Sequence, residues 1–514
     1  MDRGRGEGAE VVEPLILAAE AYPRMEEVAL SARSTLLVAM RIFEPDTALR
    51  SEAALGRGLA TWADLLAHRA AEGVTVRVLV ADFDPIMARD LHEKARAAVK
   101  GLEEAARASD GRLAVLPARH PGEIGAVWRT ALWPLVRARV DGGRRRWPPV
   151  RLWPATHHMK IIVADGREMV IGGLDVNERR YDEPSHDRPA EETWHDVSAF
   201  VAGAAAARAD RFVRWLWSQE IARRERLGVG AGGGENAVAT PAIPPLPDVD
   251  PPARKVQRLG EGIRFIVTAS DRAPSPFAVG PRLLSASMME ESAAIVRAAG
   301  WFLYVENQFV RDPAFLEVVV RRMRAVPELQ LVVLVPAAPD KVAFDSKAGA
   351  GQRHGEWLQS RALDRLMRLF GDRVGVFMLA GARLPEDGEA DQERATADGR
   401  GIVYVHSKVL IADDRVASIT SANLNARSLR MDTEAGVSFG GREVAAFRQR
   451  LWRHHLGCDT PASGDLLTVW REAADANAAR EPGAGGTGRL VVWWDREAAA
   501  RFGKRLPFVP TRYV

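Results

Sequence analysis

The chain has very little cysteine and no long apolar segment. Of its 514 residues only Cys458 is a cysteine, which excludes an intrachain disulfide and any cysteine-based metal cluster. No stretch approaches the roughly 20 apolar residues that span a bilayer. Acidic residues interrupt the N-terminal segment where an export signal would need an apolar core. We therefore expect a cytoplasmic protein that meets any membrane from outside.

A strong excess of one charge is also missing. The 71 Lys and Arg residues nearly balance the 68 Asp and Glu residues, which leaves a formal net charge of +3. Proteins that bind nucleic acid usually carry a concentrated basic patch, so no nucleic-acid partner is expected here. The length exceeds what one hydrophobic core usually fills, which predicts two domains or a duplicated fold.

What the chain does contain is one short motif twice. His406 and Lys408 are followed by Asp413, and the spacing recurs in a triplet nearer the N-terminus: His158, Lys160 and Asp165. Residues two apart on a strand share a face, so each motif should place an imidazole beside an ammonium group. A group that transfers protons near pH 7, next to a fixed positive charge, suits an anionic phosphate. Two copies at corresponding positions favour a functional reading.

The pattern of secondary structure also repeats. Strands are predicted at 34–40, 74–80 and 160–164, and comparable strands at 302–305, 329–335 and 409–412, with helices between them. This alternation predicts an α/β fold. We expect two similar halves, each a mixed β-sheet flanked by helices, packed about a pseudo-twofold axis.

The expected domain boundaries follow from composition. Residues 1–227 and 257–460 should form the two catalytic halves, joined by a Gly/Pro-rich linker at 228–256 and followed by a C-terminal extension at 461–514. Within the second half, a helix is predicted over 282–299 and a polar loop over 385–398.

The repeated motif resembles the signature of the phospholipase D superfamily, H-x-K-x4-D-x6-G-[GS]-x-[ND]. The first copy continues through Gly172, Gly173 and Asp175, and the second through Thr420, Ser421 and Asn423. Four further segments resemble the phosphatidylcholine-hydrolysing, eukaryotic-like branch: GGLDVNERRYD, SANLNARSL, YVENQF and WHD. The resemblance extends over residues 33–457.

The sequence departs from that branch in three respects. Thr420 replaces the usual Gly, and Arg179 replaces the Gly before Arg-Tyr-Asp. No separate lipid-binding domain of the kind found in eukaryotic relatives is expected in this sequence. These departures put the mode of membrane targeting in question and leave the chemistry unaffected.

The resemblance implies a role for each residue of the site. His158 would be the nucleophile that forms a phosphohistidine, and His406 the acid that protonates the leaving alcohol. The phosphate would be held or its binding supported by a larger set: Lys160, Lys408, Asn177, Asn423, Ser421, Gly172 and Gly173.

The remaining polar residues are expected to support the site. Asp165 and Asp413 lie at the far end of their strands and should fix the turn that follows. Candidates for orienting the imidazoles are Asp196 and Glu434. A nearby polar network is expected at Glu306, Asn307 and Gln308, while His157 should point to the opposite face of its strand. We expect no cofactor and no metal-binding cluster.

The expected function is a phospholipase D that cleaves the distal phosphodiester of phosphatidylcholine-like lipids to phosphatidic acid and the head-group alcohol. The acceptor would be water or a second alcohol. The alternatives are a cardiolipin-synthase-like phosphatidyltransferase, a nuclease or other phosphodiesterase, and a non-catalytic lipid-binding protein. A monomer bound peripherally to the membrane is expected, because one chain carries both motifs. Interfacial candidates are Trp147 and the pair Trp493-Trp494, although packing in the core or on an edge strand is the favoured role for the pair.

Overall fold

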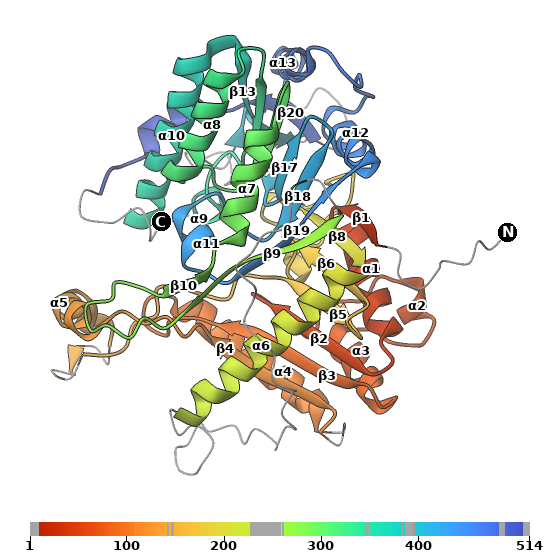
Figure 1. Cartoon of the computed structure of the whole chain (residues 1–514), viewed down its shortest axis with the longest axis vertical. Helices are drawn as coiled ribbons and strands as arrows, with labels where there is room; N and C mark the ends of the chain where they lie inside the picture. The colour runs from red at the N-terminus through yellow and green to blue at the C-terminus, as the bar shows by residue number, and fades with distance from the viewer. Residues whose placement is uncertain are drawn as a thin grey trace.

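Two large mixed β-sheets, one in each half of the chain, make up the core of the molecule (Figure 1). The computed structural model describes residues 10–226, 262–344, 349–382, 394–482 and 489–506, apart from a few positions inside these ranges (108, 110, 141–142, 145–146, 148 and 395), and in addition residues 259, 384 and 385. The sheets and their covering helices confirm the predicted α/β class. The expected linker at 228–256 and most of the loop at 385–398 lie outside the described residues.

The first half forms a seven-stranded sheet with the order β1-β8-β6-β5-β2-β3-β4. Its strands are β1 (Val11–Ile16), β2 (Thr35–Met40), β3 (Thr75–Asp82), β4 (Leu113–Arg119), β5 (Ile161–Ala164), β6 (Glu168–Gly172) and β8 (Val197–Ala202). Its helices are α1 (Ala18–Ser31), α2 (Glu52–Leu55), α3 (Trp62–Ala71), α4 (Arg89–Ala106), α5 (Ala126–Val136) and α6 (Ala204–Arg226). The neighbours β2, β3 and β4 run parallel, and the other pairs are antiparallel.

The second half forms a nine-stranded sheet with the order β10-β9-β19-β18-β17-β11-β12-β13-β20. Its strands are β9 (Ile263–Asp271), β10 (Arg282–Ser285), β11 (Phe302–Asn307), β12 (Gln330–Leu334), β13 (Val374–Gly381), β17 (Lys408–Ala412), β18 (Val416–Thr420), β19 (Glu434–Gly440) and β20 (Arg489–Trp493). The helices are α7 (Ser287–Ala298), α8 (Pro313–Ala325), α9 (Asp340–Ala343), α10 (Ala350–Phe370), α11 (Ala426–Arg430), α12 (Arg442–Leu456), α13 (Leu466–Ala478) and α14 (Arg496–Phe502). A short hairpin, β14 (Thr396–Ala397) and β15 (Arg400–Gly401), lies apart from the sheet.

The two sheets share one strand order. Six consecutive strands of the first sheet have counterparts in the second. The order β8, β6, β5, β2, β3, β4 matches β19, β18, β17, β11, β12, β13, and the parallel pairs stand at the same places. The second sheet adds an edge strand at each end, β10 and β20. Because β20 belongs to the segment after residue 460, the C-terminal extension completes the second sheet. Its Trp494 is buried, and Trp493 is 37% exposed on the edge strand.

Alternation of side chains along the strands divides the core into layers. Leu36 and Val38 of β2 face a cluster with α1, α3 and α4, whereas Leu37 and Ala39 face a cluster that also contains residues of the second sheet. The outer face of the second sheet packs on α7, α8 and α10. The inner faces of the two sheets therefore share a continuous hydrophobic core, to which α6, α12 and α13 contribute (Figure 1).

One predicted helix begins later than expected. The helix predicted over 282–299 is α7 from Ser287 only, because Arg282–Ser285 instead forms the edge strand β10 antiparallel to β9. The side chains of Arg282 and Leu283 are exposed, as on a sheet edge. Tertiary pairing with β9 thus outweighs local helix propensity.

Candidate active site

Both motif histidines lie at the junction of the two halves, just before β5 and β17. The backbone N–H of His158 donates to the carbonyl of Thr433 at 2.8 Å, and that of His406 donates to the carbonyl of His195 at 2.8 Å. In the second case a two-stranded parallel ladder forms between β7 (Trp194–His195) and β16 (Tyr404–Val405). The backbone of each histidine is therefore fixed against the chain of the other half. The residue that accepts each hydrogen bond is followed directly by a buried carboxylate, Glu434 or Asp196.

Those carboxylates hold the imidazole rings. Nδ1 of His158 lies 2.9 Å from Oε2 of Glu434, and Nδ1 of His406 lies 2.6 Å from Oδ2 of Asp196. Each pair joins one half of the chain to the other. Since Nδ1 is occupied in both rings, Nε2 of each histidine is left for substrate.

Burial favours the neutral forms of these groups. The pKa values of His158 and His406 are both lowered well below the usual range by burial, and next by the neighbouring Lys160 and Lys408 respectively. Burial raises the pKa of Glu434 to about 8 and raises that of Asp196 as well. A bound phosphate anion would offset the positive lysines and favour protonation of an imidazole.

The two lysines lie beneath the histidines. Nζ of Lys160 donates to the carbonyl of His158 at 2.6 Å, and Nζ of Lys408 donates to the carbonyl of His406. Both side chains are buried, and burial lowers the pKa of Lys160 to about 8 and that of Lys408 to about 7. Each lysine thus lies at the first residue of its strand or directly before it, and each histidine lies just outside the ladder.

A cleft with a volume of about 420 Å³ opens over the two imidazoles. Four arginines line it: Arg41, Arg180, Arg311 and Arg427. Within the described part of the chain, Nε of Arg41, Nε of Arg311 and Nη1 of Arg180 have no hydrogen-bond partner although they are buried. A buried donor without a partner costs about 1–3 kcal/mol, so an anion bound among these arginines would be stabilised.

Comparison with known proteins finds relatives among the phospholipases D. The sequence model of the family described as Phospholipase D matches residues 358–469. Phospholipase D alpha 1 from Vigna unguiculata is 24% identical over 427 residues, which cover 62% of this chain and 52% of that protein. Phospholipase D1 from Schizosaccharomyces pombe is 25% identical over 401 residues, covering 59% of this chain and 27% of the yeast protein. Residues 358–469 thus match the Phospholipase D family, and the chain resembles phospholipases D over about 60% of its length.

The chain spans about half the length of the plant phospholipase D and about a quarter of the yeast one. A solved structure covers more of it: phosphatidylserine synthase from Haemophilus influenzae superposes on 97% of this chain and 92% of its own, with a TM-score of 0.50 and 14% identity. This likeness is one of fold. The residues that the superfamily signature marks can now be placed one by one.

The signature aspartates lie away from the cleft. The carboxylate of Asp165 accepts hydrogen bonds from the backbone N–H groups of Arg33, Ser34 and Thr35 at 2.7–2.8 Å. Asp413 accepts from Trp301 and Phe302 at 2.9 Å, and also from Gly300. Both carboxylates therefore fix the start of an interior strand of their sheet, β2 or β11.

The turns after β6 and β18 carry the small residues of the signature. A Cβ on Gly173 would collide with the carboxylate of Asp196, so this glycine leaves room for the partner of His406. A Cβ on Gly172 would lie 2.5 Å from Cα of Ser198, its cross-strand neighbour. In the second half Ser421 donates to Glu434 at 2.5 Å and thereby supports the partner of His158.

The predicted amide residues divide between cleft and scaffold. Asn423 lines the cleft, and its Oδ1 has no hydrogen-bond partner among the described residues. Asn177 instead caps the short 3-10 helix Glu178–Arg180, its Oδ1 accepting from the N–H of Arg179 at 2.8 Å. Asn423 therefore faces the cleft, whereas Asn177 supports the loop.

The three polar residues of the segment Glu306–Gln308 also have different positions, one at the cleft and two behind it. Gln308 lines the cleft and donates to Tyr404 at 3.0 Å, while Asn307 accepts from the N–H of Leu424 at 3.1 Å below the turn. Glu306 is buried behind the cleft, where it accepts from Ser407. His157 packs against His120 with ring centroids 5.2 Å apart, away from the cleft residues.

The four cleft arginines are not among the site residues predicted from the sequence. Arg180 and Arg427 stand inside the quoted segments GGLDVNERRYD and SANLNARSL, while Arg41 and Arg311 follow the ends of β2 and β11. A search for cations at strand ends would have found them. Arg180 also stacks on Trp194, its guanidinium carbon 3.6 Å from the ring centroid.

Proposed function

We propose that the chain cleaves phosphodiesters of glycerophospholipids, with phosphatidylcholine-like lipids as substrates. The observation that carries this proposal is the paired imidazoles, each held at Nδ1 by a buried carboxylate of the other half and facing one arginine-lined cleft. Such an arrangement supplies a nucleophile and a proton donor on either side of one phosphorus atom.

The reaction would proceed in two steps. Nε2 of His158 attacks phosphorus, forming a P–N bond, while the P–O bond to the head-group alcohol breaks and His406 donates its proton to the departing oxygen. Water then loses a proton to His406 and attacks phosphorus, which breaks the P–N bond and releases phosphatidic acid. An alcohol in place of water would give transphosphatidylation. The arginines and Asn423 would stabilise charge on the phosphoryl oxygens.

The assignment of nucleophile and acid rests on the superfamily resemblance. Both rings are held in the same way, so their geometry favours neither order. The phosphohistidine is therefore proposed on His158 and is tested below by trapping.

A phosphatidyltransferase is the second candidate, because the same intermediate serves either acceptor. The Haemophilus influenzae neighbour bears the name phosphatidylserine synthase, but that likeness concerns the fold. Choice of acceptor distinguishes the two candidates, and the assay must therefore offer both water and alcohols.

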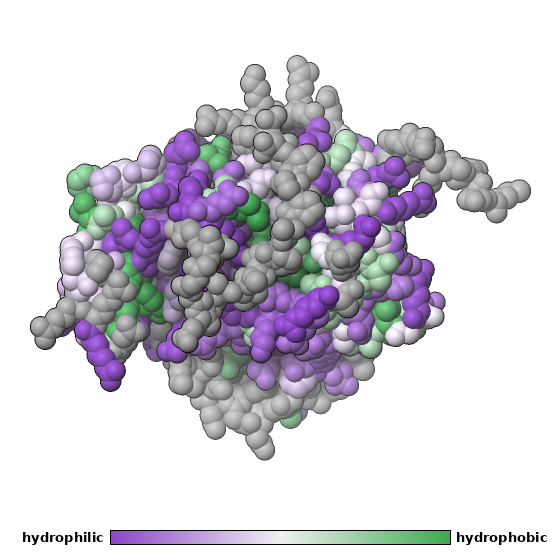
Figure 2. Space-filling view, turned by 90° about the horizontal axis from the view of Figure 1, so that it is seen from below, coloured by the Kyte–Doolittle hydropathy of each residue, from purple (hydrophilic) through white to green (hydrophobic). Residues whose placement is uncertain are grey.

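Membrane engagement is proposed at the projection formed by α5 and the segments beside it. Leu135, Phe277 and Trp128 are 75%, 67% and 44% exposed, and Trp128 donates to the carbonyl of Phe277 at 2.9 Å. Seen from below, hydrophobic surface gathers at the left edge of the molecule, on the side from which α5 projects (Figure 2). The exposed Arg137 and Arg139 would add attraction to anionic lipid.

The projection is connected to the cleft. Ile86 packs with the buried residues Trp133 and Val136 of α5, and two residues further on Ala88 lines the cleft. A membrane bound to α5 would therefore lie beside the cleft opening. Among the described helices, none combines the length and apolarity that crossing a bilayer requires.

The decisive experiment is choline release from phosphatidylcholine vesicles, with ethanol or serine offered as competing acceptors. Free choline with phosphatidic acid supports a hydrolase, whereas exclusive formation of phosphatidylserine or another transfer product supports the transferase. Cleavage of DNA with untouched vesicles would overturn the lipid proposal. Loss of vesicle turnover in Leu135→Ser, with retained turnover of a soluble short-chain lipid, would support the α5 surface. The matched control is Leu369→Ser, an exposed leucine on α10.

A further inference from the structure

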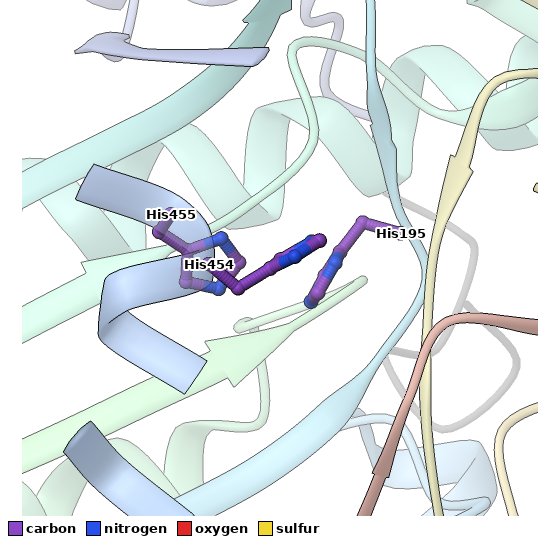
Figure 3. Close-up of side chains that lie close together, drawn as sticks. All are labelled: His195, His454 and His455. Carbon is purple, nitrogen blue, oxygen red and sulfur yellow. The ribbon is translucent and has the colours of Figure 1, made fainter. Parts of the chain in front are cut away.

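Three histidines converge behind the catalytic cleft. His195 stands on β7, and His454 and His455 stand near the end of α12; their rings point toward one another (Figure 3). One ring nitrogen of each lies within 4.8 Å of those of the other two. The ring centroid of His195 is 5.2 Å from that of His454 and 4.5 Å from that of His455. No metal-binding cluster is predicted from the sequence, in which His454 lies 259 residues after His195.

Several of these ring nitrogens have no protein partner. His195 and His455 are fully or almost fully buried. Among the described residues, no hydrogen bond reaches Nδ1 of His195, Nδ1 of His455 or Nε2 of His454. Buried polar atoms are normally paired, so three unpaired nitrogens in one cluster are available to bind a ligand.

A carboxylate holds two of the rings from the other side. Oε1 of Glu306 lies 2.7 Å from Nε2 of His195, and Oε2 lies 3.2 Å from Nε2 of His455. Histidines that bind a metal usually present their second nitrogen to a carboxylate, which fixes the tautomer and the ring orientation. Glu306 thus lies close to the Nε2 atoms of both rings, and within the described residues their Nδ1 atoms have no hydrogen-bond partner.

We propose that His195, His454 and His455 bind a divalent transition metal of the Zn²⁺ class. Imidazole nitrogen suits such ions, and a water molecule would complete a four-coordinate shell. The buried Glu306 would offset part of the charge. Arg489, which acts on the pKa of His454 as a nearby positive charge, opposes binding and should keep the affinity below that of cysteine-rich structural sites.

The site would join the two halves where the proposed acid is held. The carbonyl of His195 accepts the backbone N–H of His406, and Glu306 accepts a hydrogen bond from Ser407. Asp196, the next residue after His195, holds the ring of His406. A metal ion here would therefore stabilise the position of His406 from behind, while the three histidines stay outside the lining of the cleft.

The test is Zn²⁺ binding to the full chain after removal of bound metal with a chelator. Titration calorimetry should show one equivalent of Zn²⁺, a rise in Tm, and tetrahedral absorption bands when Co²⁺ replaces Zn²⁺. His454→Ala, at the half-exposed position, should weaken binding at least tenfold. The matched control is His68→Ala, a half-exposed helical histidine beside Glu72, which should bind as the parent does.

A second variant separates this site from the cleft. The double variant His158→Ala/His406→Ala should retain the Zn²⁺ equivalent even though it lacks the proposed catalytic pair. Absence of binding to the parent chain, equal binding by His454→Ala, or loss of binding in the double variant would each overturn the proposal. If His454→Ala does not fold, His454→Asn and the Co²⁺ spectrum of the parent provide the same decision. Metal binding is measured without turnover, so its failure leaves the phosphodiesterase proposal standing.

Discussion

In the first half of the site a glycine faces the buried carboxylate, and in the second half a serine does. Gly173 leaves space that Asp196 fills, whereas the hydroxyl of Ser421 donates to Glu434. The shorter carboxylate therefore approaches the turn closely, and the longer one is held by an added hydrogen bond. The two halves have the same strand order, but the supports of their histidines are different.

A second difference concerns the strands beside the turns. In the first half Gly172 pairs with Ser198, and in the second Thr420 pairs with Gly436. The small and the larger residue have exchanged strands, so Thr420 occupies space that Gly436 leaves. The departure of Thr420 from the signature is thus compensated across the ladder, which shows that the motif position tolerates a side chain when its neighbour has none.

The largest effects should come from the histidines themselves. His158→Ala and His406→Ala should each lower choline release about 10³-fold or more, because each removes a nucleophile or a proton donor. A phosphatidyl ester of p-nitrophenol, whose leaving group needs no acid, separates the roles. His406→Ala should release a burst of p-nitrophenol and accumulate an adduct on His158, measured by mass spectrometry after alkaline quench. An adduct on His406 in His158→Ala would reverse the assignment.

Substitutions at the two turns should lower kcat to very different extents. Gly173→Ala should lower kcat about 10²-fold, because the added Cβ displaces Asp196 and with it the ring of His406. Ser421→Ala removes one hydrogen bond to Glu434 and should lower kcat only several-fold, since net loss of one such bond costs about 1 kcal/mol. Steady-state kinetics on vesicles compares them. Equal losses would mean that the glycine is not needed for the position of Asp196.

The exchanged strand neighbours should be coupled in stability. Gly436→Ser should lower the free energy of unfolding by about 1–3 kcal/mol, because a Cβ there would lie 2.5 Å from Cγ2 of Thr420. Thr420→Gly in the same chain should restore most of the loss by recreating the arrangement of the first half. Urea unfolding of the two single variants and the double variant gives the coupling energy. Simple additivity would contradict the compensation.

The two copies also differ in the residue before each motif histidine, which is His157 in the first copy and Val405 in the second. Burial lowers the pKa of His157 to about 3. The unfolded chain therefore binds a proton below about pH 6.5 that the folded chain does not, and stability falls as the pH is lowered. His157→Val should reduce this fall by about 2 kcal/mol between pH 7 and pH 5. Urea unfolding at both pH values measures it, and an unchanged pH slope would contradict the assignment.

Much of the fold could be predicted because its signals are local. The strands predicted at 34–40 and 74–80 consist of continuous or alternating apolar residues. In the structure β2 and β3 have the same bounds to within one or two residues. The helix over 282–299 was wrong at its start, because Arg282–Ser285 is held as a strand by β9, a partner that local propensity does not contain. The same limit applies to the cleft arginines, which come from four segments far apart along the chain.

By itself the sequence determined that the chain carries two equivalent His–Lys pairs on a duplicated α/β framework, because motif spacing and apolar periodicity are properties of short segments. Only the tertiary structure decided which carboxylate holds which histidine. Glu434 reaches His158 and Asp196 reaches His406, across 276 and 210 residues of chain. The same holds for His195 with His454 and His455. Such pairings depend on how the two sheets pack on their common core. Burial, which no short segment fixes, then lowers the pKa of both histidines and both lysines of the site.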